Sequence, residues 1–175
     1  MRANHSKEFM QALFRQCGDL MLAITRLPQP VIARVHGIAT AAGCQLVSMC
    51  DLAVAADVAR FAVSGINVGL FCSTPAVGLA RNLGRKAALE MLLTGDFIDA
   101  MEARAKGLVN RVVPADALDA EIERLAQSIL AKSAVAVRMG KGMFYKQLEM
   151  GLDEAPAYAG KPPASRPLVA RARRA

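Results

Sequence analysis

The 175-residue sequence contains no tryptophan and only two tyrosines, and aromatic residues make up 5% of it. Proteins that hold single-stranded nucleic acid stack the bases on aromatic side chains along a basic groove. The formal net charge of +7 is basic, but much of it falls in residues 161–175, which carry +5 and no acid. We therefore expect no nucleic-acid partner, and we predict that residues 161–175 form a disordered, solvated tail.

Cysteine is scarce and unpatterned. The four cysteines, Cys17, Cys44, Cys50 and Cys72, form no CxxC pair and have no metal-ligand spacing. This excludes the common zinc motifs, and it predicts buried, reduced thiols and no metal centre. No apolar run reaches the roughly 18–20 residues of a membrane span, and the first residues do not read as a secretory signal. We expect no membrane partner and a cytoplasmic location.

Hydrophobic residues make up 54% of the chain and charged residues 21%, values typical of one globular domain. Periodicity and turn residues predict short strands that alternate with helices, which indicates an α/β architecture. The predicted domain covers residues 1–158, and the tail covers 159–175. The predicted strands are residues 31–35, 52–56, 61–63 and 108–113. The predicted helices are residues 8–27, 39–49, 76–83, 86–93, 100–106, one capped by Asp116, and 133–148, with a long loop over 64–78.

One segment has the pattern of a binding site. Over residues 35–46 a strand ends, small residues follow and a helix begins. The N–H groups at such a helix start are unpaired, and small side chains let a ligand approach them, which is typical of an anion or oxyanion site. Tight helix–sheet packing is the alternative explanation. His36, Asp51 and Asp57 fit packing, turn or capping roles better than catalytic ones.

Several separate motifs, in collinear order, resemble the crotonase (enoyl-CoA hydratase/isomerase) superfamily over about residues 8–150. They are residues 30–46 (PVIARVHGIATAAGCQL), 50–55 (CDLAVA), 92–96 (LLTGD) and 107–114 (GLVNRVVP). Residues 65–75 (GINVGLFCSTP) resemble the branch of enoyl-CoA hydratase domain-containing proteins. The resemblance implies a ClpP/crotonase fold, an acyl-CoA thioester ligand and no cofactor other than the coenzyme A of the substrate. It also implies a homo-oligomer, a trimer or hexamer, in intact family members.

The resemblance also assigns residues to a site. It implies that the N–H of Ala42 holds the thioester carbonyl, with Ala41 and Gly43 beside it. Ser64, Asn67 and Pro75 are candidates for contact with the substrate. The family's second oxyanion donor belongs to strands upstream of the first helix, which we expect to be missing here, and the residues after Tyr158 resemble no part of the family.

Two substitutions change the chemistry that the resemblance implies. Family hydratases use two glutamates to add water to a double bond, and the matching positions here are Gln45 and Gly65. Because neither can exchange a proton, we expect an enoyl-CoA hydratase-like lyase or isomerase with weak or absent hydration. The alternative is a non-catalytic acyl-CoA-binding pseudoenzyme or fragment that acts as an oligomer subunit.

Overall fold

The computed structural model describes residues 6–160, which divide into two compact units. Among these residues the first unit is 6–27 with 31–125, and the second is 28–30 with 126–160. The predicted tail over 161–175 lies outside the described residues. No described helix is long and apolar enough to cross a membrane.

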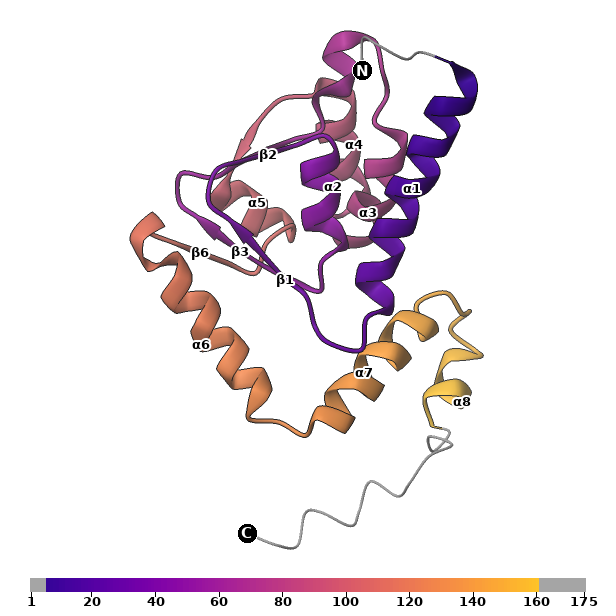
Figure 1. Cartoon of the computed structure of the whole chain (residues 1–175), viewed down its shortest axis with the longest axis vertical. Helices are drawn as coiled ribbons and strands as arrows, with labels where there is room; N and C mark the ends of the chain where they lie inside the picture. The colour runs from indigo at the N-terminus through magenta and orange to yellow at the C-terminus, as the bar shows by residue number, and fades with distance from the viewer. Residues whose placement is uncertain (1–5, 161–175) are drawn as a thin grey trace, which may run out of the picture. The chain divides into compact units, whose positions relative to one another are not determined.

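The first unit alternates short strands with helices (Figure 1). Its elements before the fifth strand are α1 (Lys7–Arg26), β1 (Ile32–Val35), β2 (Ile38–Thr40), α2 (Ala42–Met49), β3 (Leu52–Ala56), β4 (Arg60–Ala62), the 3₁₀ helix η1 (Ser64–Val68), α3 (Ser73–Asn82) and α4 (Arg85–Thr94). Those that follow are β5 (Ile98–Asp99), α5 (Ala100–Lys106), β6 (Arg111–Val113), the 3₁₀ helix η2 (Ala115–Ala117) and α6 (Leu118–Leu130), which ends in the second unit. The second unit adds α7 (Ala134–Gln147) and α8 (Ala155–Ala159).

The strands form two three-stranded sheets. In the first, the order is β1–β3–β6 and both pairings are parallel. In the second, the order is β2–β4–β5, in which β2 and β4 run parallel and β5 runs antiparallel to β4. Parallel neighbours need crossover connections, and here helices supply them. The α/β fold class is therefore confirmed.

A hydrophobic core joins the strands to the helices that follow them. Phe61 of β4, Leu79 of α3 and Met91 of α4 are each at most 1% exposed. Burying a side chain of this size contributes about 1.5–3 kcal/mol. Helix α2 contacts both α1 and α3 (Figure 1). The core therefore fixes the position of α2, the helix that starts at the predicted site.

Capping by neighbouring residues sets the bounds of two helices. The Ser6 hydroxyl accepts from the Phe9 N–H at 3.1 Å at the start of α1. The Asp99 carboxylate accepts from the Glu102 N–H at 2.8 Å at the start of α5, and Gly107 ends that helix with φ of 91°. A carboxylate or hydroxyl at the helix start satisfies an otherwise unpaired N–H, so the bounds of these helices follow from their own residues.

Other boundaries were predicted wrongly. The helix predicted over 39–49 begins only at Ala42, because residues 38–40 form strand β2, which pairs with β4. The loop predicted over 64–78 contains η1 and the first turns of α3. The strand predicted over 108–113 covers only 111–113, and Asp116 lies inside η2 instead of capping α6. The two errors in the strands share one cause: the strands have two to five residues, too few for a reliable alternation pattern.

Candidate functional site: the start of helix α2

Helix α2 begins at an unusual backbone turn. Ala41 has φ of 49° and ψ of −116°, and it is the one non-glycine residue with positive φ in the described part of the chain. These angles match the first central position of a type II′ turn, about +60° and −120°, which glycine favours. The Ala41 N–H donates to the Ala62 carbonyl at 3.0 Å, and the Gln45 N–H donates to the Ala41 carbonyl at 3.0 Å. One hydrogen bond to strand β4 and one to helix α2 thus fix the turn.

The turn presents backbone N–H groups to the outside. Within residues 6–160 the N–H groups of Ala42 and Gly43 have no hydrogen-bond acceptor, and both residues are exposed. A Cβ atom built on Gly43 would meet no heavy atom within 4 Å, so a ligand has room to approach. The positive end of the helix dipole lies behind these groups. This is the arrangement predicted for Ala41, Ala42 and Gly43, and it suits an oxygen that carries negative charge.

Gln45 lies on the first turn of the same helix. The residue is only 5% exposed, and its Oε1 atom accepts a weak hydrogen bond from the Cys17 thiol of α1, with 3.9 Å between sulfur and oxygen. Its side chain carries no titratable group, so it cannot act as a general acid or base. The structure thus brings Gln45 near Ala42 along the helix, as predicted, and adds Cys17, which the sequence analysis did not single out.

Gly65 lies where no side chain fits. A Cβ atom on Gly65 would be 2.6 Å from the Leu70 carbonyl oxygen and 2.7 Å from the Cys72 sulfur. The Gly65 N–H also donates to the Cys72 sulfur at 3.3 Å. Gly65 does not have positive φ, so space and not backbone angle restricts this position. In the sequence Cys72 is only one of four thiols without a pattern, so this contact could not be predicted from it.

A hydrogen bond between two hydroxyl groups joins the end of β2 to the start of η1. The Thr40 and Ser64 hydroxyl oxygens are 2.9 Å apart. The residues meet because β2 and β4 are parallel neighbours, with Thr40 opposite Ala62 in the register. Parallel strands bring their carboxyl ends to one edge of a sheet, so Ser64 lies beside the turn that starts α2.

Asn67 and Pro75, the other two residues predicted to contact a substrate, make contacts within the fold. The Asn67 amide donates to the Gly95 carbonyl at 3.4 Å, at the end of α4. Pro75 is buried in the first turn of α3. In the described structure both residues have packing or capping roles, and their contact with a substrate stays a prediction.

Cys44, next to Gln45, is fully buried, whereas Cys17, Cys50 and Cys72 are half-buried, and all four are free thiols. The prediction of four buried thiols is therefore right only for Cys44. Burial raises the pKa of Cys44 to about 12, and the nearby Cys72 thiol adds to the rise. Cys44 is therefore a packing residue and not a nucleophile.

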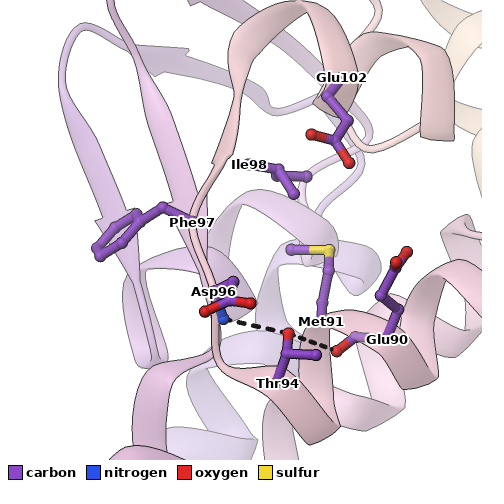
Figure 2. A pocket seen from close by; sticks show the side chains of 7 residues that line it. All are labelled: Glu90, Met91, Thr94, Asp96, Phe97, Ile98 and Glu102. Carbon is purple, nitrogen blue, oxygen red and sulfur yellow. Dashed lines mark hydrogen bonds between the residues drawn. The ribbon is translucent and has the colours of Figure 1, made fainter.

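A pocket of about 220 Å³ lies between α4 and α5. Figure 2 shows the side chains that line it. None of the predicted site residues lines it. Its Glu90 and Glu102 carboxylates both pair with Lys106 at 3.2 Å, and these hydrogen bonds raise the pKa of the Lys106 ammonium group. The described residues contain no group of three or more metal-ligating side chains. The pocket therefore has no evident connection with the chemistry at α2.

A family model described as enoyl-CoA hydratase/isomerase matches residues 1–159. The chain belongs to the enoyl-CoA hydratase/isomerase family. Among curated proteins it is 50% identical to enoyl-CoA hydratase domain-containing protein 3, mitochondrial, of Xenopus laevis, over 89% of this chain and 53% of the relative. The human protein of the same name is also 50% identical, over 85% of this chain and 49% of the relative.

Solved structures of the enoyl-CoA hydratase/isomerase family have the same fold. The structure of an enoyl-CoA hydratase from Mycobacterium smegmatis superposes with a TM-score of 0.90 at 65% identity, over 91% of this chain and 62% of that one. Human enoyl coenzyme A hydratase domain-containing protein 3 gives a TM-score of 0.85 at 49% identity, over 88% and 61%. The crotonase fold and the resemblance to the domain-containing branch are thus confirmed.

The relatives also correct one expectation. The chain spans about half the length of the curated relatives that it matches. Those family members are named as mitochondrial. The prediction of a cytoplasmic location is therefore wrong. It rested on the lack of a secretory signal, a feature that does not distinguish the cytoplasm from other compartments.

Proposed function

We propose that this chain contributes the acyl-binding part of a crotonase-family protein that holds an acyl-CoA thioester, with the thioester carbonyl oxygen against the N–H of Ala42. The observation that carries the proposal is the turn at Ala41, which leaves the Ala42 N–H unpaired at the exposed start of α2. A backbone donor of this kind stabilises the negative charge that develops on the carbonyl oxygen when an enolate forms. Family membership supports the choice of thioester as ligand.

We further propose that this site does not hydrate a double bond. Each general acid or base contributes about 10²–10⁴-fold to a rate. Gln45 has a carboxamide, and Gly65 has no room for a carboxylate because of the Leu70 oxygen and the Cys72 sulfur. Without either group, an attacking water has no base and C2 of the acyl chain has no proton donor.

The competing proposal is an acyl-CoA-binding subunit without turnover. The exposed apolar residues on α1 favour association, since Phe9, Leu13, Phe14 and Leu20 are 36–56% exposed. Apolar groups gathered on one helix are typical of surfaces that become covered. In this form of the proposal the chain keeps the thioester site and assembles with further copies, as a trimer or hexamer.

Calorimetric titration with butyryl-CoA, and with free coenzyme A as the matched ligand, tests the binding proposal. We expect butyryl-CoA to bind more tightly, because only the thioester offers a carbonyl to Ala42. Replacing the Ala41–Ala42 amide by an ester removes the N–H and keeps every side chain. It should weaken butyryl-CoA binding about three- to tenfold, the value of one neutral hydrogen bond, and leave coenzyme A binding unchanged.

This ester is a cleaner test than Ala42→Pro, because a residue before proline favours ψ of about +120° to +160° and Ala41 has ψ of −116°. Equal affinities for butyryl-CoA and coenzyme A would contradict the binding proposal. Rapid hydration of crotonyl-CoA would contradict the second proposal. Turnover of any acyl-CoA would separate the enzyme from the non-catalytic subunit, and light scattering during size-exclusion chromatography would give the number of copies.

A further inference from the structure

Cys17 lies on the inward face of α1. Met21 and Ile24, which follow it at spacings of four and three residues on the same helix face, are buried, at 4% and 7% exposure. Cys17 itself is half-buried, so its thiol stays accessible from one side. Its sulfur lies 3.9 Å from the Oε1 atom of Gln45, on the first turn of α2. The thiol is therefore at the boundary between core and surface, beside the start of α2.

The side chain of Gln45 gives a second, independent sign that a ligand binds beside this thiol. Only 5% of the residue is exposed. One end of its carboxamide faces the Cys17 sulfur, and the other end has no hydrogen-bond partner among residues 6–160. This holds whichever end faces the sulfur, because a half-turn of the carboxamide exchanges its oxygen and nitrogen. Every fully buried side-chain nitrogen and oxygen in the described structure has a partner, so the unpaired end reaches space that a ligand can enter.

The position of Gln45 on α2 relates this thiol to the Ala42 N–H. Residues three apart on a helix lie on the same face, with about 5–6 Å between their Cβ atoms. In a thioester whose carbonyl oxygen is on the Ala42 N–H, C3 of the acyl chain is two bonds from the carbonyl carbon. An acyl chain that runs along this face of α2 reaches the side chain of Gln45, which the Cys17 sulfur contacts. Cys17 is thus the thiol that faces C3 of such an acyl group.

We propose that Cys17 is a covalent modification site, which captures 2-enoyl thioesters by adding its sulfur to C3. This inference rests on the proposed function, since the Ala42 N–H holds the thioester in both. The double bond of a 2-enoyl thioester is conjugated to the carbonyl group, which makes C3 electrophilic, and a thiolate is the nucleophilic form of cysteine. A thiol ionises far more readily than water, so this addition does not require the carboxylates that positions 45 and 65 lack.

The addition needs no reactant other than the thioester and water. The thiol loses its proton to water, the bond between sulfur and C3 forms, and the π bond between C2 and C3 breaks. The electron pair moves through C2 onto the carbonyl oxygen, where the Ala42 N–H stabilises the enolate. C2 then takes a proton from water. The net reaction adds the sulfur and hydrogen of the thiol across the double bond, and coenzyme A stays attached to the acyl group.

Incubation of the full chain with crotonyl-CoA, followed by mass spectrometry of the intact protein and of its peptides, tests the inference. We expect one adduct per chain, with the mass of the whole crotonyl-CoA molecule, on the peptide that contains Cys17. Cys50 is the matched thiol, because it is also half-buried and lies at the opposite end of α2. Its adduct should form at least about tenfold more slowly, since no bound acyl chain is held beside it. Iodoacetamide should modify both thiols.

Two variants and one competitor serve as controls. Cys17→Ser removes the nucleophile with little change in shape and should abolish the adduct, whereas Cys50→Ser should form it at the wild-type rate. Butyryl-CoA has no double bond, so it should form no adduct. In excess it should slow the reaction of crotonyl-CoA with Cys17 at least about tenfold, because it occupies the same site. If Cys17→Ser does not fold, peptide mapping of the wild-type chain still locates the adduct.

Three results would overturn the inference while the proposed function stands, provided that butyryl-CoA binds better than free coenzyme A. The first is the absence of an adduct, and the second is an adduct spread equally over Cys17 and Cys50. The third is an adduct that carries the acyl group without coenzyme A, because the sulfur would then have attacked the carbonyl carbon. If butyryl-CoA binds no better than free coenzyme A, the proposed function fails and this inference fails with it.

Discussion

The Cys72 sulfur occupies the space that a side chain at Gly65 would need. A Cβ atom placed on Gly65 would lie 2.7 Å from that sulfur. The Leu70 carbonyl oxygen closes the same space at 2.6 Å. The resemblance to the family led to Gly65 as the position of a missing carboxylate. In this chain the loop leaves no room at position 65 for a carboxylate side chain.

A methyl group at position 65 should therefore destabilise the protein. We expect Gly65→Ala to lower the free energy of unfolding by about 1–3 kcal/mol, the usual cost of overpacking. Gly37→Ala is the control, because a Cβ there meets nothing within 4 Å, and it should stay within about 0.5 kcal/mol. Urea unfolding measures both. Equal stability of the two variants would refute the steric argument.

The same collision predicts that hydration is not restored by Gln45→Glu combined with Gly65→Glu. A glutamate Cβ at position 65 would collide with the Leu70 carbonyl oxygen and the Cys72 sulfur. The double variant should therefore unfold at a lower urea concentration than the wild-type chain and hydrate crotonyl-CoA no faster than it does. Gln45→Glu alone is the control for the change in charge. A folded double variant with faster hydration would show that the loop can open.

Ala41 is strained in its turn, so glycine should improve stability there. We expect Ala41→Gly to raise the free energy of unfolding by about 1 kcal/mol, because a non-glycine residue with positive φ costs about 1–3 kcal/mol and glycine loses part of that gain to entropy. Ala42→Gly, at the next residue with ordinary helical φ, should instead lower it by about 0.5–1 kcal/mol. Chemical unfolding of both variants measures whether each change raises or lowers the free energy of unfolding. A lower value for Ala41→Gly than for the wild-type chain would contradict the claim that Ala41 is strained.

The start of α6 is joined to β6 by charge, which makes its stability depend on pH. Arg124 and Arg111 donate to the Glu121 carboxylate at 2.7 and 2.8 Å, and they lower the pKa of that carboxyl below 4.5. The contribution of Glu121 is therefore present above about pH 4.5 and is lost as the pH falls through the lowered pKa.

We expect Glu121→Gln to reduce thermal stability at pH 7, and we expect the difference from the wild-type chain to shrink steadily below pH 4.5 and to fall with added salt. Asp116→Asn, on η2 just before α6, removes one negative charge without breaking these pairs and serves as the control. A difference that is the same at pH 7 and pH 3 would exclude the ion pairs as its cause.

The thiols should react in an order that follows burial. Because Cys44 is fully buried and its pKa is raised to about 12, alkylation by iodoacetamide at pH 8 should leave it unmodified in the folded protein. The half-buried Cys17, Cys50 and Cys72 should react before Cys44 under the same conditions. Peptide mass spectrometry locates the adducts, and unfolding in guanidinium should abolish the order. Modification of Cys44 as fast as Cys17 would mean that the core around α2 opens readily.

Much of the helical framework could be predicted from the sequence. Helices α1 and α5 begin and end within one or two residues of the predicted bounds, because Ser6, Asp99 and Gly107 act on their own neighbours. The order of the family motifs along the chain also sufficed to identify the fold, and the residue types at positions 45 and 65 already excluded a pair of carboxylates there.

Only the tertiary structure decided how those positions are used. Strand β2 exists because three residues find a parallel partner in β4, and residues 38–40 alone are too few to distinguish a strand from the start of a helix. The contacts of Cys17 with Gln45, of Thr40 with Ser64 and of Asn67 with Gly95 join residues 24 to 28 positions apart. Capping and periodicity act over three or four residues, so they can be predicted from the local sequence. Contacts across the core depend on how helices and strands pack, and that packing exists only once the chain has folded.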